Sequence, residues 1–166
     1  EGGKRRKRAV QLDIETVEAG LPTPEFPPLT EPFDLLVTGV GGTGVVTVGA
    51  LITMAAHLEG KGSSVLDFTG FAQKFGTVLS YIRLSTSPET LNQVRIDHSA
   101  ADAVIGCDIV VSSAPKASVH YRKGTKVVLN RAEMPTGDLV LRRDAQLKVD
   151  AREAEIGHVV GPDHVA

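Results

Sequence analysis

The sequence predicts an α/β fold in which helices cover a mixed sheet. Three observations support this prediction. Short apolar runs alternate with helical segments between residues 34 and 130, a glycine-rich turn follows the first run, and only a short loop joins the second and third runs. The 166 residues suffice for one compact domain with its own core.

Composition is that of a globular protein in solution. Hydrophobic residues make up 42% of the chain, and the formal net charge is −2. No apolar run reaches the roughly 18 residues that cross a bilayer, and no segment resembles a signal peptide. Cys107 is the single cysteine, so the chain has no cysteine set for a disulfide or an iron–sulfur cluster. We therefore expect a cytoplasmic protein with no membrane partner.

Residues 1–31 are expected to form a basic and proline-rich linker, and residues 32–166 the folded domain. The run 4–8 is entirely Lys and Arg, and four prolines between positions 22 and 28 favour extended backbone. Because no aromatic residues interleave with the basic run, we interpret it as a solvated tether and expect no nucleic-acid partner.

Within the domain, the apolar patterns predict strands and helices of ordinary length. The run 34–40 is continuously apolar, as in a strand buried within a parallel sheet. A helix is predicted over 44–58 and ends at the glycines of 60–62. Further strands are predicted over 63–68, 77–85, 108–113 and 125–130, with a short helix after Pro115. The segment 131–166 is more polar, and its weak periodicity predicts no particular element.

The turn between the first strand and the first helix has the pattern G-x-G-x-x-G, formed by Gly39, Gly41 and Gly44. Such a turn exposes backbone N–H groups at a helix N-terminus, which favours a bound phosphate. Asp67 ends the next predicted strand, near the position of a ribose-binding acid. An NAD- or FAD-binding domain is therefore one interpretation of the pattern. The other is that the glycines only allow the helix to pack closely on the sheet.

The segment between the second and third predicted strands argues against a dehydrogenase. Parallel neighbours need a crossover of about ten or more residues, usually a helix. The segment bracketed by Gly70 and Gly76 is too short for one. We therefore predict that the strands 63–68 and 77–85 pair antiparallel.

The ordered motifs also resemble a known family. They are GVGGTGVVTVGALITMAAHLEGKGSSVLDFTGFAQKFGTVLSYIRL over 39–84, the approach VEAGLPTPEFPPLTEPFDLLVTGV over 17–40, ADAVIGCDIVV over 101–111, and VVLNRAEMPTGD over 127–138. Together they resemble the gamma domain of 2-oxoacid:ferredoxin oxidoreductases, in particular the fused indolepyruvate ferredoxin oxidoreductases. One departure is that Phe75 precedes Gly76, where the family usually has a second glycine, which affects the loop around Gln73.

The resemblance implies a fold and a function. The fold is a three-layer, Rossmann-like domain with a mixed, mostly parallel sheet, expected here to be truncated at its C-terminus and therefore prone to self-association. The enzymes oxidatively decarboxylate a 2-oxoacid to an acyl-CoA and pass the electrons to ferredoxin. Thiamine diphosphate, Mg and 4Fe-4S clusters are implied on the alpha and beta domains, which are the expected partners, and coenzyme A (CoA) is a co-substrate. The isolated chain is expected to be inactive, with no catalytic and no metal-binding residue.

The resemblance and the glycine pattern together select candidate residues for contact with a cofactor. The pyrophosphate of CoA is expected near the N-terminus of the first helix, and the loop after the second strand offers hydroxyl, backbone and amide groups. Contact with CoA and pure packing both stay open for these residues. They are Gly39, Gly41, Gly42, Thr43, Gly44, Thr69, Gly70 and Gln73.

Other reactive residue types receive structural interpretations. Cys107 is expected to be a core thiol, and His57 to suit the dipole at the end of the first helix. The segment from Glu133 to Asp138 is predicted to be a turn. The remaining histidines, at positions 98, 120, 158 and 164, do not have the spacing of metal ligands.

Overall fold

The structure, a computed structural model, describes residues 19–23, 25, 28–70, 76–132 and 148–166. Most of the expected linker, the run 4–8, Gln73, Phe75 and the expected turn from Glu133 to Asp138 lie outside the described residues. Within the described part of the chain, no helix has the length and apolarity needed to span a membrane.

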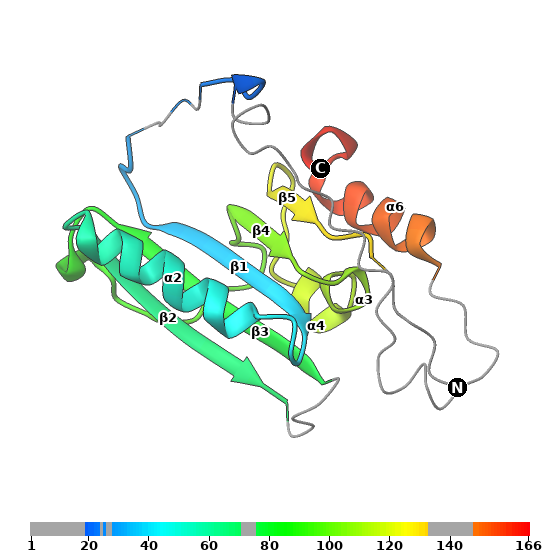
Figure 1. The fold of residues 1–166 in the computed structure, drawn as a ribbon, viewed down its shortest axis with the longest axis horizontal. Helices are drawn as coiled ribbons and strands as arrows, with labels where there is room; N and C mark the ends of the chain where they lie inside the picture. Colours follow the sequence, from blue (N-terminus) through cyan, green and yellow to red (C-terminus); the bar gives the residue numbers. More distant parts are fainter. Residues whose placement is uncertain (1–18, 24, 26–27, 71–75, 133–147) are drawn as a thin grey trace, which may run out of the picture.

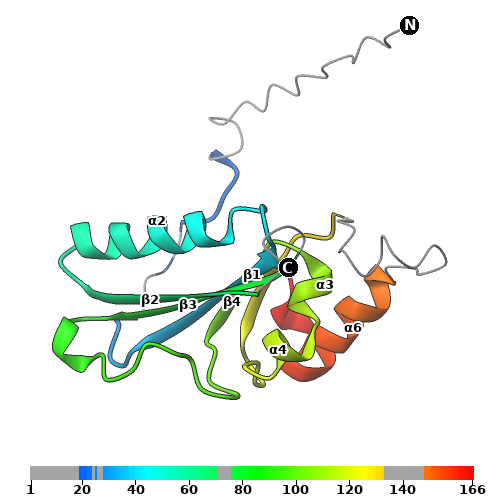
Figure 2. The same cartoon turned by 90° about the horizontal axis from the view of Figure 1, so that it is seen from below.

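Helices cover both faces of a five-stranded sheet (Figures 1 and 2). On one face lies α2 (Val45–Leu58), and on the other lie α3 (Ile109–Ser112), α4 (Pro115–Ser118) and α6 (Val149–Val160). The predicted three-layer α/β architecture is thereby confirmed.

The order of the strands in the sheet is β2-β3-β1-β4-β5. These strands are β1 (Phe33–Val40), β2 (Gly62–Thr69), β3 (Thr77–Ser85), β4 (Ala103–Gly106) and β5 (Lys126–Leu129). β3 pairs antiparallel with both β2 and β1, whereas the pairs β1–β4 and β4–β5 are parallel. Only β3 runs against the other described strands. The mixed sheet and the antiparallel pairing across 63–85 are both confirmed.

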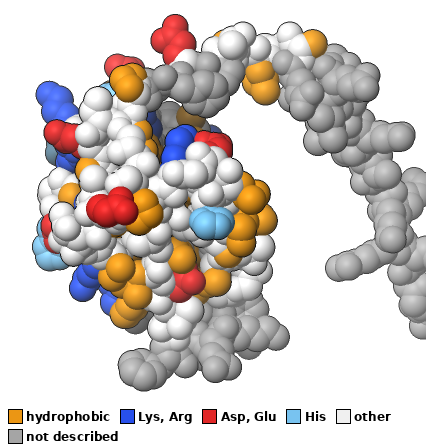
Figure 3. Space-filling model, turned by 90° about the vertical axis from the view of Figure 1, so that its left-hand side faces the viewer, with side chains coloured by type: hydrophobic (Ala, Val, Ile, Leu, Met, Phe, Trp, Pro, Cys, Tyr) orange, Lys and Arg blue, Asp and Glu red, His pale blue; other side chains and the backbone are white. Residues whose placement is uncertain are grey.

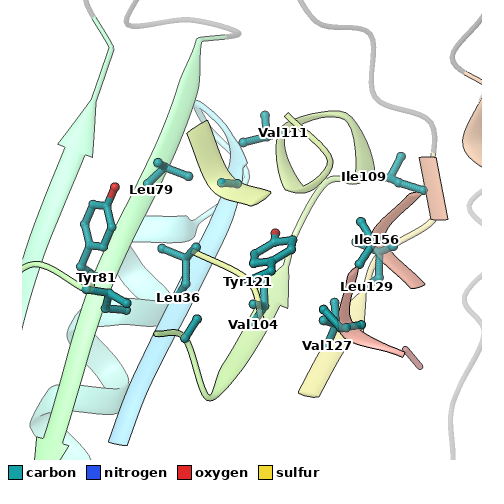
Figure 4. Packing of buried hydrophobic residues seen from close by; sticks show 14 of the residues in the cluster. Leu36, Leu79, Tyr81, Val104, Ile109, Val111, Tyr121, Val127, Leu129 and Ile156 are labelled. Atoms are coloured by element: carbon teal, nitrogen blue, oxygen red, sulfur yellow. The ribbon is translucent and has the colours of Figure 1, made fainter. Parts of the chain in front are cut away.

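The buried side chains of β1 alternate between two hydrophobic clusters. Leu35 and Val37 face α2, where they join Val45 of that helix. Leu36 and Val40 face the opposite layer and pack in the larger cluster, which Figure 4 shows between the sheet and the helices α3 and α6. Burial on both faces explains why this segment is continuously apolar in the sequence.

The strand predicted over 108–113 is wrong. The strand β4 ends at Gly106, and α3 occupies Ile109–Ser112. Asp108 causes the difference, since its carboxylate accepts a hydrogen bond from the N–H of Val111 at 2.9 Å and so caps a helical turn. The two hydrophobic side chains Ile109 and Val111 are buried in this turn as they would be in a strand.

The C-terminal segment adds structure that the sequence pattern did not predict. Only Ile156, Gly157 and Val160 of α6 are buried, which leaves little periodicity to detect. After a 3-10 turn over Pro162–His164, Val165 forms a parallel bridge with Val127 of β5. The outer edge of β5 therefore has a neighbour. A second 3-10 turn spans Pro88–Thr90.

Candidate functional site

The predicted glycine turn joins the carboxyl end of β1 to the first turn of α2. Gly42 and Gly44 have φ angles of 98° and 89°, a region of backbone conformation that favours glycine. Thr43 fixes the turn, since its N–H and its hydroxyl both donate to the carbonyl of Val40, at 3.0 and 2.7 Å. At Gly44, the helix N-cap, an added Cβ would meet none of the described residues within 4 Å, so the requirement for glycine comes from its positive φ.

Gly39 is required for a different reason, which is close packing. A Cβ at this position would lie 2.6 Å from Oγ1 of Thr43, 2.8 Å from Cγ2 of Val45 and 3.0 Å from Cβ of Cys107. The loop, the helix and the end of β4 therefore converge on one bare backbone position.

The N-terminus of α2 carries no negative charge of its own. Gly44 has no side chain with which to cap the helix, and the first turn holds no acidic residue. A helix end of this kind leaves N–H groups available to an anion and favours negative charge through its dipole.

The β2–β3 hairpin brings the second group of predicted residues to the same end of the sheet. The N–H of Gly41 donates to the carbonyl of Gly76 at 2.8 Å, and the N–H of Gly70 donates to Thr77 at 3.2 Å. Thr69 is exposed at the end of β2. The predicted residues that the structure describes therefore lie along one edge, although Gln73 is outside the described residues.

A pocket of about 500 Å³ lies beside the glycine turn, on the face of the sheet that carries α2. Its lining is Thr43, Ile105, Gly106, Cys107, Val128, Leu129 and Asn130. Cys107 and Asn130 each directly follow a parallel strand, at the carboxyl edge where ligands of α/β sheets bind. We did not predict these two residues as part of a site, although their positions after β4 and β5 would have indicated it.

Two polar groups shape this pocket. The amide of Asn130 donates to the carbonyl of Cys107 at 3.2 Å, while its oxygen accepts from the N–H of Ala132 at 2.9 Å. The Cys107 thiol is half-buried, and burial, together with the nearby charge of Asp108, raises its pKa above the ordinary value. The thiol is therefore protonated at neutral pH and is a weak nucleophile.

Comparison with known proteins identifies the family. A sequence model of the family described as "Pyruvate ferredoxin/flavodoxin oxidoreductase" matches residues 34–158. The chain belongs to this family. The matched range contains β2 to β5, all of β1 except Phe33, and the glycine turn, so the candidate site lies within the family domain.

Relatives and a solved structure agree with this assignment. Proteins named indolepyruvate oxidoreductase subunit IorB, from Thermococcus kodakarensis and Pyrococcus horikoshii, are 28% and 27% identical over 103 residues. The match covers 62% of this chain and 48% of each relative, so the chain spans about half the length of these curated relatives. The crystal structure of pyruvate oxidoreductase subunit PORC from Thermotoga maritima shares the fold, with a TM-score of 0.50 at 15% identity over 63% of this chain and 53% of that one.

The chain thus carries the domain of this oxidoreductase family, and the predicted resemblance to the family is confirmed. Its topology places Asp67 on the edge strand β2, with β3 between β2 and β1. Two strand spacings separate that edge from β1, or about 10 Å. In dinucleotide-binding domains, by contrast, the acid that binds the ribose lies on the strand directly beside the strand that leads into the glycine turn. The geometry therefore does not favour the NAD or FAD interpretation.

The domain shows no cluster of metal ligands among its described residues, where no three His, Cys, Asp or Glu side chains converge. His98 and His120 come closest to one another, with ring centroids 5.7 Å apart in an edge-to-face arrangement. His120 is buried and has two partners, the hydroxyl of Tyr81 at 3.2 Å from Nε2 and the carbonyl of Asp97 at 3.0 Å from Nδ1. These contacts make it part of the core. His57 lies in the last turn of α2, as predicted.

Proposed function

We propose that this gamma-type domain works within an indolepyruvate:ferredoxin oxidoreductase. That enzyme would convert a 2-oxoacid to an acyl-CoA and pass the electrons to ferredoxin. Support comes from the family match over 34–158 and from relatives that are named as subunits of indolepyruvate oxidoreductases.

The residues of this chain do not fit the enzyme's other cofactors. A 4Fe-4S cluster takes four thiolates, whereas the sequence has one cysteine. Among the described residues, no three His, Cys, Asp or Glu side chains converge as ligands of a metal ion. We therefore assign the thiamine diphosphate, Mg and 4Fe-4S sites to alpha and beta domains in the same enzyme.

The part of the reaction that suits this domain is the binding of CoA. The observation that carries the proposal is that the glycine turn, with an open helix N-terminus, borders a pocket of about 500 Å³ at the carboxyl edge of β4 and β5. The first turn of α2 would receive the pyrophosphate, and the pocket would receive a less polar part of the molecule. Gly39, Gly41, Gly42, Thr43 and Gly44 form this turn, and Thr69, Gly70 and Gln73 belong to the neighbouring hairpin.

Individual residues have distinct roles in this proposal. Thr43 holds the turn in place through Val40, so that the N–H groups stay oriented without a cost at the time of binding. Cys107 retains the proton on Sγ because its pKa is raised, and it therefore does not compete with the thiol of CoA.

The test uses the complete enzyme and the substitution Asn130→Asp, which places a carboxylate on the pocket at nearly constant volume. Repulsion of the phosphates should raise KM for CoA at least ten-fold and leave KM for indolepyruvate within two-fold. Asn92→Asp is the matched control, because Asn92 is equally an exposed asparagine but lies on the β3–β4 connection. Equal KM values for CoA in wild type and Asn130→Asp would contradict the proposed site.

The substrate class is tested separately with the wild-type enzyme. Ferredoxin reduction should be faster, in kcat/KM, with indolepyruvate than with pyruvate by at least ten-fold. A preference for pyruvate would refute the indolepyruvate assignment and leave the CoA proposal intact.

A further inference from the structure

The outer edge of β2 has few of the features that usually protect an edge strand, and its one charged residue is Asp67. All eight residues of β2 pair with β3 in continuous register, without a bulge. The strand contains no Lys and no Pro, and within the described chain nothing pairs with its outer edge. An edge that is long, regular and unprotected is a template for pairing with another strand.

The surface around this edge is apolar on both faces of the sheet. Val65 faces α2, and Leu66 and Phe68 face the other side; they are 40%, 38% and 46% exposed. Above β2, the helix α2 has no Lys, Arg, Asp or Glu in its 14 residues. Figure 3 views the molecule from the end where α2 finishes and β2 begins, and hydrophobic side chains lie open on this face. A helix that is apolar all round is normally covered.

We propose that two copies of this chain associate through this edge, with β2 pairing antiparallel to β2 of the second copy about a two-fold axis. The two sheets would join into one continuous sheet, with the two α2 helices side by side on one face. The CoA pocket lies beside β4 and β5, although Thr69 and the first turn of α2 border both sites. The pairing is inferred from the edge of β2 and the exposed side of α2, so it does not rest on the proposed function.

Backbone geometry selects the register of this pairing. The N–H of Gly70 points to Thr77 of β3, so in the antiparallel ladder Val65 and the alternate residues on either side direct their N–H and C=O groups outward. An axis at Val65 pairs this residue with its own copy. It also places Ser63, whose hydroxyl donates to the carbonyl of Thr53 at 3.3 Å, opposite Asp67 of the second copy, so that no two charges face each other. An axis at Asp67 would instead oppose two like charges.

The helices fit the same axis. α2 lies over the gap between β2 and β3, since a Cβ on Gly49 would touch Ser80 of β3 and lie 3.5 Å from Cγ2 of Val65. With strands about 4.8 Å apart, each helix axis then lies about 5 Å from the two-fold. The resulting separation of about 10 Å agrees with the 8–10 Å of packed helices. The helices would cross near the small side chain of Ala50, with Val46 of one against Met54 of the other.

The available apolar area is close to what a stable dimer of minimal size needs. Such an interface removes about 600 Å² from each protomer, a little more than half of it apolar. If a fully exposed side chain of this size presents about 100 Å², the apolar side chains here supply roughly 300 Å². They are between 38% and 79% exposed, namely Val46, Met54, Leu58, Val65, Leu66 and Phe68.

The register is tested by disulfide formation in the 166-residue chain with Cys107→Ala as background. Val65→Cys should give a covalent dimer on oxidation with diamide, because opposed Cα atoms in this pairing are about 5.5 Å apart. Thr69→Cys is the control on the same strand, since its two copies would be about 27 Å apart along the strands. Cross-linking of Thr69→Cys as efficient as that of Val65→Cys would overturn the proposed register.

The surface itself is tested by sedimentation at concentrations from about 1 to 100 μM. Val65→Lys should weaken dimerisation at least ten-fold. Val128→Lys should not, although Val128 is 61% exposed on the opposite edge strand. A wild-type chain that stays monomeric at 100 μM, or a dimer dissociated by Val128→Lys and not by Val65→Lys, would refute the proposal. Because both side chains are exposed, melting temperatures near that of the wild type serve to confirm folding.

Discussion

The substitution Gly39→Ala tests the packing of the glycine turn more directly than any other. Its new methyl group would lie 2.6 Å from Oγ1 of Thr43 and 2.8 Å from Cγ2 of Val45. Neither neighbour moves freely, because Thr43 is tied to Val40 by two hydrogen bonds and Val45 is buried at the start of α2. The loop or the helix must therefore shift.

Overpacking of this kind costs about 1–3 kcal/mol. For a chain of this size each kcal/mol lowers the melting temperature by about 2–4 °C, so thermal denaturation followed by circular dichroism should show a decrease of about 2–12 °C. Gly70→Ala is the matched control at the same end of the sheet. Among the described residues its Cβ would meet only the carbonyl of Thr77, at an ordinary 3.5 Å, and the melting temperature should change little.

A double-mutant cycle assigns the effect to the contact with Thr43. Thr43→Ala removes the nearest atom, so the two substitutions together should cost at least about 0.5 kcal/mol less than the sum of their separate effects. The loop has more room than the structure indicates if Gly39→Ala has the melting temperature of the wild type. The same follows if the effects of Gly39→Ala and Thr43→Ala on the free energy of unfolding simply add.

Three further predictions concern the turn, the core and the ligand. Gly44→Ala should destabilise the chain by about 1–2 kcal/mol through its φ of 89° alone, and a melting temperature equal to that of the wild type would show that the turn relaxes. Burial lowers the pKa of His120, so His120 binds a proton more weakly in the folded state than in the unfolded state. The free energy of unfolding should therefore fall as the pH drops below about 6.5, and the slope should be smaller in His120→Gln. Finally, calorimetric titration should detect no micromolar binding of NAD(P) or FAD, and such binding would restore the dehydrogenase interpretation.

The sequence was sufficient for the part of the fold where local signals agree. Contiguous residues indicate the apolar run of β1, the glycine turn and the helix that follows. The short loop between Gly70 and Gly76 predicted that β3 runs antiparallel to β2. The apolar run after Gly106 misled the prediction because one capping carboxylate, that of Asp108, converts it to a helical turn. The sequence did not predict α6 because only three of its residues are buried, which leaves too few apolar positions for a helical pattern.

The candidate site was predicted only in part, for a geometric reason. The glycines of the turn are contiguous and visible in the sequence, although only the structure separates Gly42 and Gly44, which need positive φ, from Gly39, which needs space. The pocket wall comes from Cys107 and Asn130, which are adjacent only because β4 and β5 pair in parallel.

The way in which α2 is held has a consequence for the motions of the chain. The helix begins at a glycine cap with no side-chain hydrogen bond, contains several β-branched residues, and buries only Val45, Gly49 and Ala56. Its helical form therefore depends on the sheet beneath it and not on its own propensity. Hydrogen exchange at its amides should proceed through local opening, at a lower free energy than exchange in β1 and β3. Any molecule that binds over this helix would slow that exchange. Hydrogen exchange at the α2 amides would therefore report on assembly.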